Sequence, residues 1–202
     1  AAELYLKLLH FDSDDYANRW VAGDGIVLDP EVQAGAPCIA GTRVPTEVVE
    51  HFGWTGPLGV TYPGVVVNGV VQTAANVDKS WIGTDADDVI SAAVGGQRVS
   101  VLNDADAAGL AEEHYGAGRD KTGVIVLLTF GTGIGSAVIH NGVLLPNTEF
   151  GHLEVDGKEA EHRAASSVKE RKDWSYPRWS EEVTKVLITI ENAIWPDLFI
   201  AG

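Results

Sequence analysis

The sequence predicts an α/β fold with mixed sheets and flanking helices, and three observations support this class. An apolar strand over 99–102 runs directly into a helix expected over 105–115. The segment 123–140 contains two apolar strands joined by a glycine-rich turn. Asn68-Gly69 and Asn141-Gly142 each separate short apolar runs, and this dipeptide accepts the positive φ angles of a tight hairpin turn.

The first 46 residues predict a small, mostly helical segment. A helix is expected over 1–20 and a short strand over 26–28, which Asp29-Pro30 closes. Turns are expected at 35–37 and 41–45. A helix over 46–52 follows, with Thr46 as its N-cap.

The remaining elements follow from apolar runs and the glycine, proline or asparagine residues between them. A strand is expected over 58–61, and hairpin strands over 65–67 and 70–72. The strand 123–130 returns over 136–140, and Asn141-Gly142 leads into a further strand over 143–145. Helices are expected over 159–171 and 180–193, the latter with Ser180 as N-cap, before a final strand over 197–202.

Composition narrows the class of protein. The chain has 202 residues and a formal net charge of −15, which argues against general nucleic-acid binding because such binding depends on neutralising phosphates. Cys38 is the only cysteine, so an intrachain disulfide is excluded. Neither a membrane-spanning run nor a signal peptide is evident, and we expect a cytoplasmic protein.

One segment departs from the acidic average. Residues 158–178 carry six bases against four acids, so a polyanion would bind there more readily than elsewhere. The alternative is an ordinary solvated helix face.

Asp104 follows the strand over 99–102 and opens the next helix. The helix dipole and unpaired N–H groups at that position favour an ionised carboxylate, which can accept a proton from a sugar hydroxyl. Asn103 beside it can both donate to and accept from hydroxyls. The alternative is that Asp104 serves only as an N-cap.

The turn Gly131-Thr-Gly-Ile-Gly135 links two strands. Glycines let a backbone approach a ligand and direct N–H groups toward an anion. The spacing is neither a dinucleotide fingerprint nor a Walker loop, because a strand follows and Lys-Ser/Thr is missing. The alternative is a glycine-rich hairpin.

Polar side chains gather after the second hairpin, in Glu149-Phe-Gly-His152 and at Glu154 and Glu161. Such groups suit a polyhydroxyl ligand, because each hydroxyl needs a donor and an acceptor. A zinc site is the competing idea, but cysteine or histidine partners at short spacing are missing.

Four strings occur in the order typical of the ROK sugar kinases, and together they resemble that family from about Glu47 onward. The longer string Asn147-Thr-Glu-Phe-Gly-His-Leu-Glu-Val-Asp-Gly157 resembles specifically the polyphosphate glucokinases within it. The four strings are Val60-Thr-Tyr-Pro-Gly64, Leu102-Asn-Asp-Ala-Asp-Ala-Ala108, Leu128-Thr-Phe-Gly-Thr-Gly-Ile-Gly135 and Glu149-Phe-Gly-His152.

The resemblance implies part of an actin-like ATPase architecture and transfer of a phosphoryl group from polyphosphate or ATP to the 6-hydroxyl of glucose. It implies that Asp104 is the catalytic base and that Mg²⁺ accompanies the phosphate donor. It also makes a homodimer one possible oligomeric state. The donor phosphate would lie at Gly131, Thr132 and Gly133. The sugar would be held by Asn103, Glu149, His152 and Glu161, with Gly64 and Asn76 as further candidates. Zinc is not expected, because the family's cysteine cluster is replaced by Lys158-Glu-Ala-Glu-His-Arg-Ala-Ala-Ser166.

The string from Asp29 to Pro45 resembles instead a small antitoxin-associated bacterial domain of unknown function. The sequence therefore predicts a chimera of three parts: residues 1–46 from that domain, 47–118 from the kinase N-terminal domain and 119–202 from the kinase C-terminal domain. Because the family's opening Asp-x-Gly-Gly motif and closing glycine-rich segment are missing, we expect weak or absent turnover. Two alternatives remain at this stage, a non-catalytic scaffold that binds sugar or phosphate and an antitoxin-like interaction protein.

Overall fold

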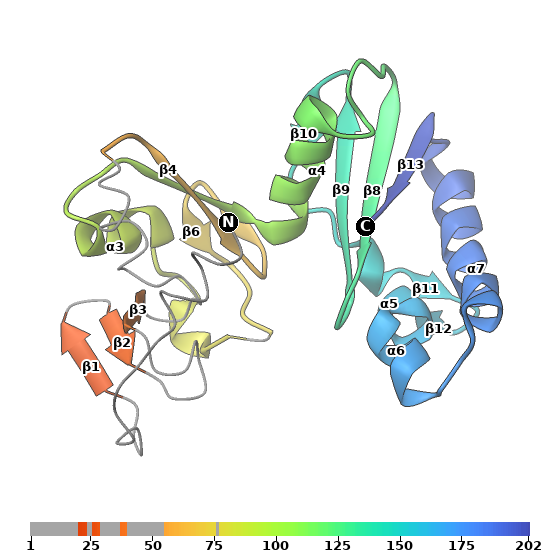
Figure 1. Ribbon diagram of the computed structural model, residues 1–202, viewed down its shortest axis with the longest axis horizontal. Helices are drawn as coiled ribbons and strands as arrows, with labels where there is room; N and C mark the ends of the chain where they lie inside the picture. Colours follow the sequence, from red (N-terminus) through yellow and green to blue (C-terminus); the bar gives the residue numbers. More distant parts are fainter. Residues whose placement is uncertain (1–19, 24–25, 29–36, 40–54, 76) are drawn as a thin grey trace, which may run out of the picture. The chain divides into compact units, whose positions relative to one another are not determined.

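The computed structural model describes residues 20–23, 26–28, 37–39, 55–75 and 77–202. The chain divides into two compact units, which we call unit 1 (Ala1–Leu102) and unit 2 (Asn103–Gly202). Each unit is described by itself below, and Figure 1 labels the elements of both. No helix in the described part of the chain is long and apolar enough to cross a lipid bilayer.

The described residues before Thr55 form a three-stranded antiparallel sheet in the order β1-β2-β3. The strands are β1 (Trp20–Gly23), β2 (Ile26–Leu28) and β3 (Pro37–Ile39). The strand expected over 26–28 is confirmed, whereas the turn expected to end at Pro37 gives way there to β3. The helix expected over 46–52 lies outside the described residues, as does that over 1–20 apart from Trp20, which begins β1.

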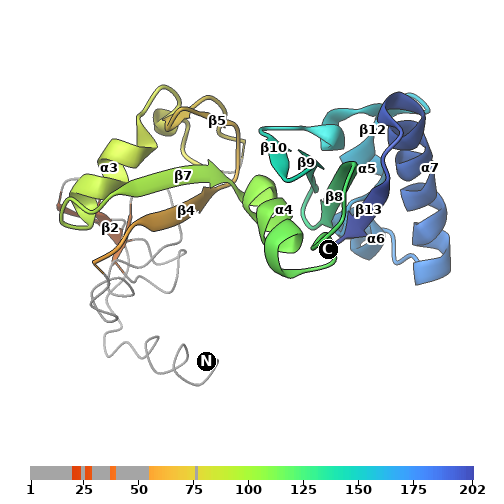
Figure 2. The same cartoon turned by 90° about the horizontal axis from the view of Figure 1, so that it is seen from above.

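The rest of unit 1 surrounds one apolar core. The strand β4 (Leu58–Tyr62) pairs with β7 (Val99–Asn103), and the two lie side by side in Figure 2. The expected hairpin is confirmed as β5 (Val66–Val67) and β6 (Val70–Val71), with φ of +51° at Asn68 and +79° at Gly69. The 3₁₀ turn η2 (Lys79–Trp81) and the helix α3 (Ala86–Ala93) were not predicted from the sequence. The core includes Val60, Tyr62, Val71, Trp81, Ile90 and Val101.

Unit 2 is built on a four-stranded mixed sheet in the order β10-β9-β8-β13. The strands are β8 (Val124–Phe130), β9 (Ile134–His140), β10 (Val143–Leu145) and β13 (Leu198–Ala201). β9 is antiparallel to β8 and to β10, whereas β13 is parallel to β8. The Asn141-Gly142 turn between β9 and β10 is confirmed, with both residues at positive φ.

Helices cover both faces of this sheet, because alternate residues of β8 face opposite sides. Val126 and Leu128 belong to a core with α5 (Ala160–Ala164) and α7 (Tyr176–Ile194). Ile125 and Leu127 belong to a core on the other face, where α4 (Asp104–Tyr115) packs. Figures 1 and 2 both show α4 and α7 on opposite sides of the strands.

The close approach of α4 to the sheet requires a glycine. A Cβ atom added to Gly109 would lie 2.5 Å from the Cβ of Ala137 on β9, which is too close for any side chain. The start of α4 is thereby held near the strand that leads out of the glycine turn.

The segment after β10 differs from the single helix expected over 159–171. It contains the 3₁₀ turn η3 (Phe150–His152) and the hairpin β11 (Glu154–Val155) and β12 (Lys158–Glu159), followed by α5 and α6 (Ser166–Arg171). Ala165, with ψ of 150°, breaks the helix between α5 and α6. The expected N-cap Ser180 is also wrong, because α7 begins at Tyr176 and Ser175 caps it through the N–H of Arg178.

Candidate functional site

The first turn of α4 is capped by Asn103 and not by Asp104. The side-chain oxygen of Asn103 accepts hydrogen bonds from the N–H groups of Ala105 at 2.9 Å and Asp106 at 3.1 Å. Asp104 is exposed, and one of its oxygens accepts a bond from the Ala105 N–H at 2.9 Å. The alternative that Asp104 is merely the cap is therefore wrong, since its neighbour performs that role and leaves the Asp104 carboxylate at the surface.

Asp106, which the sequence analysis did not single out, is the fully buried acid of this turn. One oxygen accepts a 2.7 Å hydrogen bond from the N–H of Asn147, while the other has no hydrogen-bond partner among the described residues. Burial raises the pKa of Asp106, the bond from Asn147 lowers it, and the nearby Asp104 charge raises it. The sequence does contain a signal for Asp106. It is a second acid, two residues after Asp104, in the first turn of a helix that follows a buried strand.

Residues 147–152 are held to the sheet by Ser136 on β9. Its hydroxyl donates to the carbonyl of Thr148 at 2.7 Å and accepts from the N–H of Phe150 at 3.0 Å. Together with the bond from Asn147 to Asp106, these contacts fix the segment that carries Glu149 and His152. Ser136 was also missed from the sequence, because a serine in a strand gives no local sign of which loop it will bind.

Glu149 lies within electrostatic reach of several of the predicted site residues. Partial burial of its carboxyl raises its pKa, His152 lowers it, and the negative charges of Asp106, Asp104 and Glu161 raise it further. The residue as a whole is nevertheless exposed, so its carboxyl group is accessible to a ligand.

The glycine turn between β8 and β9 lies against Glu161 and the start of α4. A Cβ added to Gly133 would lie 2.5 Å from a Glu161 oxygen, and one added to Gly135 would lie 2.9 Å from the Cβ of Ala105. Neither glycine has a left-handed backbone. Close approach to Ala105 therefore requires Gly135, whereas at Gly133 the end of the Glu161 side chain has room to move. The N–H of Gly131 donates to the Gly133 carbonyl at 3.0 Å, so that donor is engaged within the turn.

Among the described residues, His152, Glu159 and Glu161 each offer a ligand atom, and these atoms lie within 4.8 Å of one another. The His152 ring lies 3.6 Å from a Glu159 oxygen, and that carboxylate is also 3.3 Å from the His162 ring. The arrangement contains one imidazole and two carboxylates.

Most of the predicted site residues thus gather within unit 2: Asn103, Asp104, Gly131, Thr132, Gly133, Glu149, His152 and Glu161. Gly64 lies in unit 1, between β4 and β5, where an added Cβ would lie 2.8 Å from the carbonyl oxygen of Thr73. Asn76 lies outside the described residues.

A mixed sheet covered by helices on both faces, with an acid-rich helix start beside a glycine turn, defines unit 2 as an α/β structure. Solved structures share this fold. The polyphosphate/ATP-glucomannokinase of Arthrobacter sp. strain KM is 45% identical, with a TM-score of 0.73 over 78% of this chain and 64% of that one. A ROK family glucokinase from Streptomyces griseus, solved with glucose and AMPPNP, is 21% identical, with a TM-score of 0.60 over 73% of this chain and 65% of that one.

The family model described as ROK family matches residues 45–167, and the chain belongs to the ROK family. The polyphosphate glucokinase of Mycobacterium tuberculosis (strain CDC 1551) is 74% identical over 164 residues, which cover 81% of this chain and 62% of that protein. That of Mycobacterium leprae is 71% identical over 164 residues, 81% of this chain and 51% of its own length. The chain therefore spans about half to three fifths of the length of these relatives.

Residues 26–53 match a second family, described as a protein of unknown function (DUF433). Both resemblances inferred from the sequence are confirmed, as is the actin-like sugar kinase fold class.

Proposed function

We propose that this chain carries the sugar side of a glucokinase site, which transfers a phosphoryl group from polyphosphate or ATP to the 6-hydroxyl of glucose. The observation that carries the proposal is the convergence, within unit 2, of Asp104, Glu149 and Glu161 beside the glycine turn. The relatives named polyphosphate glucokinase support the choice of sugar and donor.

Asp104 is the proposed catalytic base. Its carboxylate is exposed at the first turn of α4, where the helix N-terminus stabilises negative charge. Such a carboxylate can take the proton of the attacking hydroxyl as the bond to phosphorus forms. Asn103, which caps the helix, keeps the backbone of this turn in place.

Glu149, His152, Glu161 and Asn103 are the proposed sugar ligands in unit 2. Glu149 is exposed beside the other acids, so its carboxyl group can bind a sugar hydroxyl. Gly64 and Asn76 remain further candidates from unit 1.

The donor phosphate is proposed to lie at Gly131, Thr132 and Gly133. Phosphoryl transfer relies mainly on positioning and on neutralising the donor's negative charge. Mg²⁺ bound to the donor would supply that neutralisation. The carboxylates of Glu159 and Glu161, whose ligand atoms lie within 4.8 Å of each other, are the hard oxygen ligands that this ion accepts and would be the residues to hold it.

A coupled assay for glucose 6-phosphate, run with polyphosphate and with ATP, tests the proposal. We expect slow, glucose-dependent product formation that disappears in Asp104→Asn and persists in Asp120→Asn, a control at an exposed loop position. Glucose binding without turnover, measured by calorimetry and lost in Asp104→Asn, would support a binding scaffold instead. If the chain shows no turnover and also binds no glucose, a sugar site is ruled out.

A further inference from the structure

A basic pocket lies in unit 2. Its volume is about 160 Å³, and we define it by Lys158, Arg163, Lys172 and Arg178 around Trp174. Glu182 is the one carboxylate that lines it. His162 also lines the pocket, and the ring of this histidine lies 3.8 Å from Glu161, one of the predicted sugar residues. Four cations around one acid form an unusual surface in a chain whose net charge is −15.

Glu182 fixes two of the four cations. Its side chain is 5% exposed and is paired with Arg163, and it also accepts a 2.8 Å bond from Arg178. Arg163 is further held by the carbonyl of Val155, to which it donates two bonds. The two guanidinium groups are therefore ordered before any ligand arrives, which lowers the entropy lost on binding.

The other two cations are available to a ligand. Lys158 and Lys172 are exposed, and neither forms an ion pair with any residue in the described part of the chain. The Lys172 ammonium lies 4.4 Å from the centre of the Trp174 ring, and the Arg178 guanidinium lies 4.7 Å from it. The indole thus holds two positive charges close together.

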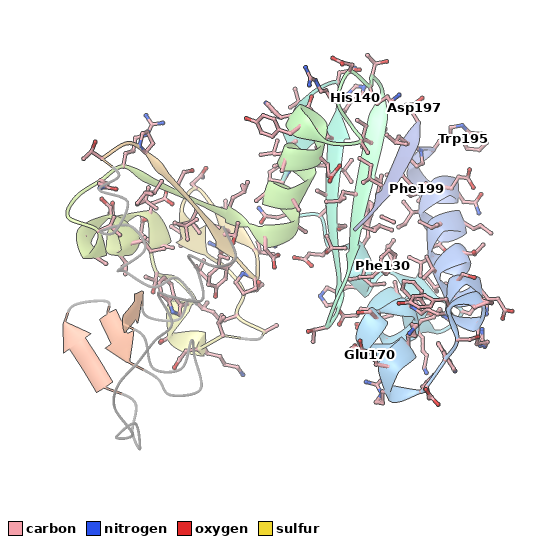
Figure 3. The ribbon with its side chains drawn as sticks, in the orientation of Figure 1. Phe130, His140, Glu170, Trp195, Asp197 and Phe199 are labelled. Carbon is pink, nitrogen blue, oxygen red and sulfur yellow. The ribbon has the colours of Figure 1, made fainter. Side chains whose placement is uncertain are left out.

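A short helix connects this pocket with the glycine turn. The hydroxyls of Ser166 and Ser167, at the start of α6, donate to the carbonyls of Gly131 and Thr132 at 3.0 and 2.7 Å. Lys172 is the residue that ends α6. The six residues of α6 rise about 9 Å along the helix axis. A chain of several phosphates is long enough to reach from the glycine turn to the basic pocket over that distance. Figure 3 shows Phe130, just before the glycine turn, and Glu170, on α6, at the same end of unit 2, whereas His140 and Asp197 lie at the other end.

We propose that the basic pocket binds the distal phosphates of an extended inorganic polyphosphate whose terminal phosphate lies at the glycine turn. This inference rests on the proposed function, and it adds a second donor subsite to it. A nucleic acid is a poorer fit, because the Trp174 ring is already covered by two cations and is not a platform on which a base could stack.

The test compares two double variants of the 202-residue chain. Lys158→Gln/Lys172→Gln removes the two unpaired cations, and Arg119→Gln/Lys121→Gln removes two exposed cations just before β8, at the strand end opposite the glycine turn. Calorimetry measures the Kd of medium-chain inorganic polyphosphate at several salt concentrations. We expect the first variant to bind about tenfold more weakly at low salt, because each exposed charge pair contributes modestly. The slope of log K against log salt should also fall, by about one to two.

The control variant should bind polyphosphate like the wild type, and the affinity for ATP should be unchanged in both variants, since its three phosphates stay near the turn. Equal losses in the two double variants would mean a diffuse charge effect and would overturn the proposal. A single-stranded oligonucleotide that binds more tightly than polyphosphate through the same lysines would overturn it in favour of nucleic acid.

The binding result separates this inference from the proposed function. Lysine-dependent polyphosphate binding without turnover supports the pocket and leaves the kinase activity in question. Turnover with polyphosphate whose KM is unaffected by Lys158→Gln/Lys172→Gln overturns the pocket and leaves the kinase activity intact.

Discussion

Glu149 and Glu182 belong to the same unit, yet their surroundings shift their pKa values in opposite directions. Around Glu149, burial and the charges of Asp104, Asp106 and Glu161 raise the pKa, and only His152 opposes them. Burial would also raise that of Glu182, but hydrogen bonds from Arg163, Arg178 and Lys185 outweigh it and lower the pKa to about 2. Unit 2 therefore keeps an acid cluster of Asp104, Asp106, Glu149 and Glu161, none of which pairs with a Lys or Arg in the described part of the chain. A separate carboxylate, that of Glu182, serves to order cations.

The difference indicates two kinds of binding surface. Carboxylates without cationic partners can bind hydroxyls or accept a proton, whereas carboxylates saturated by cations act as structural anchors. The following variants test that division, from the largest expected effect to the smallest.

Asp104→Asn should have the largest effect, on activity and not on the stability of the fold. The substitution keeps the shape of the side chain but removes the group that accepts the hydroxyl proton, so the rate of glucose phosphorylation should fall about a thousandfold. Because Asp104 is exposed, thermal unfolding should change little. A variant that retains the wild-type rate would show that Asp104 is not the base.

Glu182→Gln should lower the free energy of unfolding by about 2–3 kcal/mol, since it leaves the half-buried Arg163 without its carboxylate. The matched control is Glu181→Gln, whose exposed pair with Arg178 should contribute less than about 1 kcal/mol. Urea unfolding at neutral pH measures both.

The pH dependence of that loss provides a check. Because folding lowers the pKa of Glu182 from 4.5 to about 2, its stabilisation is complete above the unfolded pKa. It is lost as the pH falls from 4.5 toward 2. The difference between wild type and Glu182→Gln should shrink over that range, and a constant difference would contradict the assignment.

Ser136→Ala should reduce stability by about 1–2 kcal/mol, because the buried N–H of Phe150 loses its acceptor. It should also weaken glucose binding several-fold, since the same hydroxyl positions the segment that carries Glu149 and His152. Chemical denaturation and glucose calorimetry test the two effects. Ser180→Ala, at an exposed position on α7, is the control and should leave both unchanged.

Asp106→Asn should have the smallest effect, confined to the pH dependence of stability. Folding raises the pKa of Asp106, so the folded chain holds this proton to higher pH than the unfolded chain does. Its contribution is then complete below the unfolded pKa and is lost as the pH rises through the folded pKa. The variant should lose less stability over that rise than the wild type, whereas Asp120→Asn should behave as the wild type does.

Local sequence signals predicted the elements that depend on neighbouring residues. The two Asn-Gly hairpins and the four strands of the main sheet of unit 2 follow from φ preferences and apolar runs, and all are present. The helix expected over 159–171 was wrong because Ala165, an excellent helix former, is held extended between α5 and α6. Tertiary contacts, such as those of Ser166 and Ser167 with the glycine turn, outweigh its intrinsic preference.

In the candidate site, too, the sequence predicted local features and missed those that depend on distant residues. Asp104 and the glycine turn were found from their positions at the ends of strands, and their proposed roles rest on the family's motif order. Asp106 and Ser136 were missed because their partners, Asn147 and Phe150, lie 41 and 14 residues away. The basic pocket was anticipated only as a charge excess over 158–178, and the sequence could not show that Trp174 and Glu182 would gather those cations.

The central claim is that the acid cluster of unit 2 binds glucose, and amide chemical shifts during a glucose titration test it most directly. We predict saturable shifts at Asn103, Asp104, residues 149–152 and Glu161, which are reduced in Asp104→Asn, while Lys158 and Lys172 remain unaffected. Shifts that are absent at high glucose concentration, or that centre on the basic pocket instead, would contradict it.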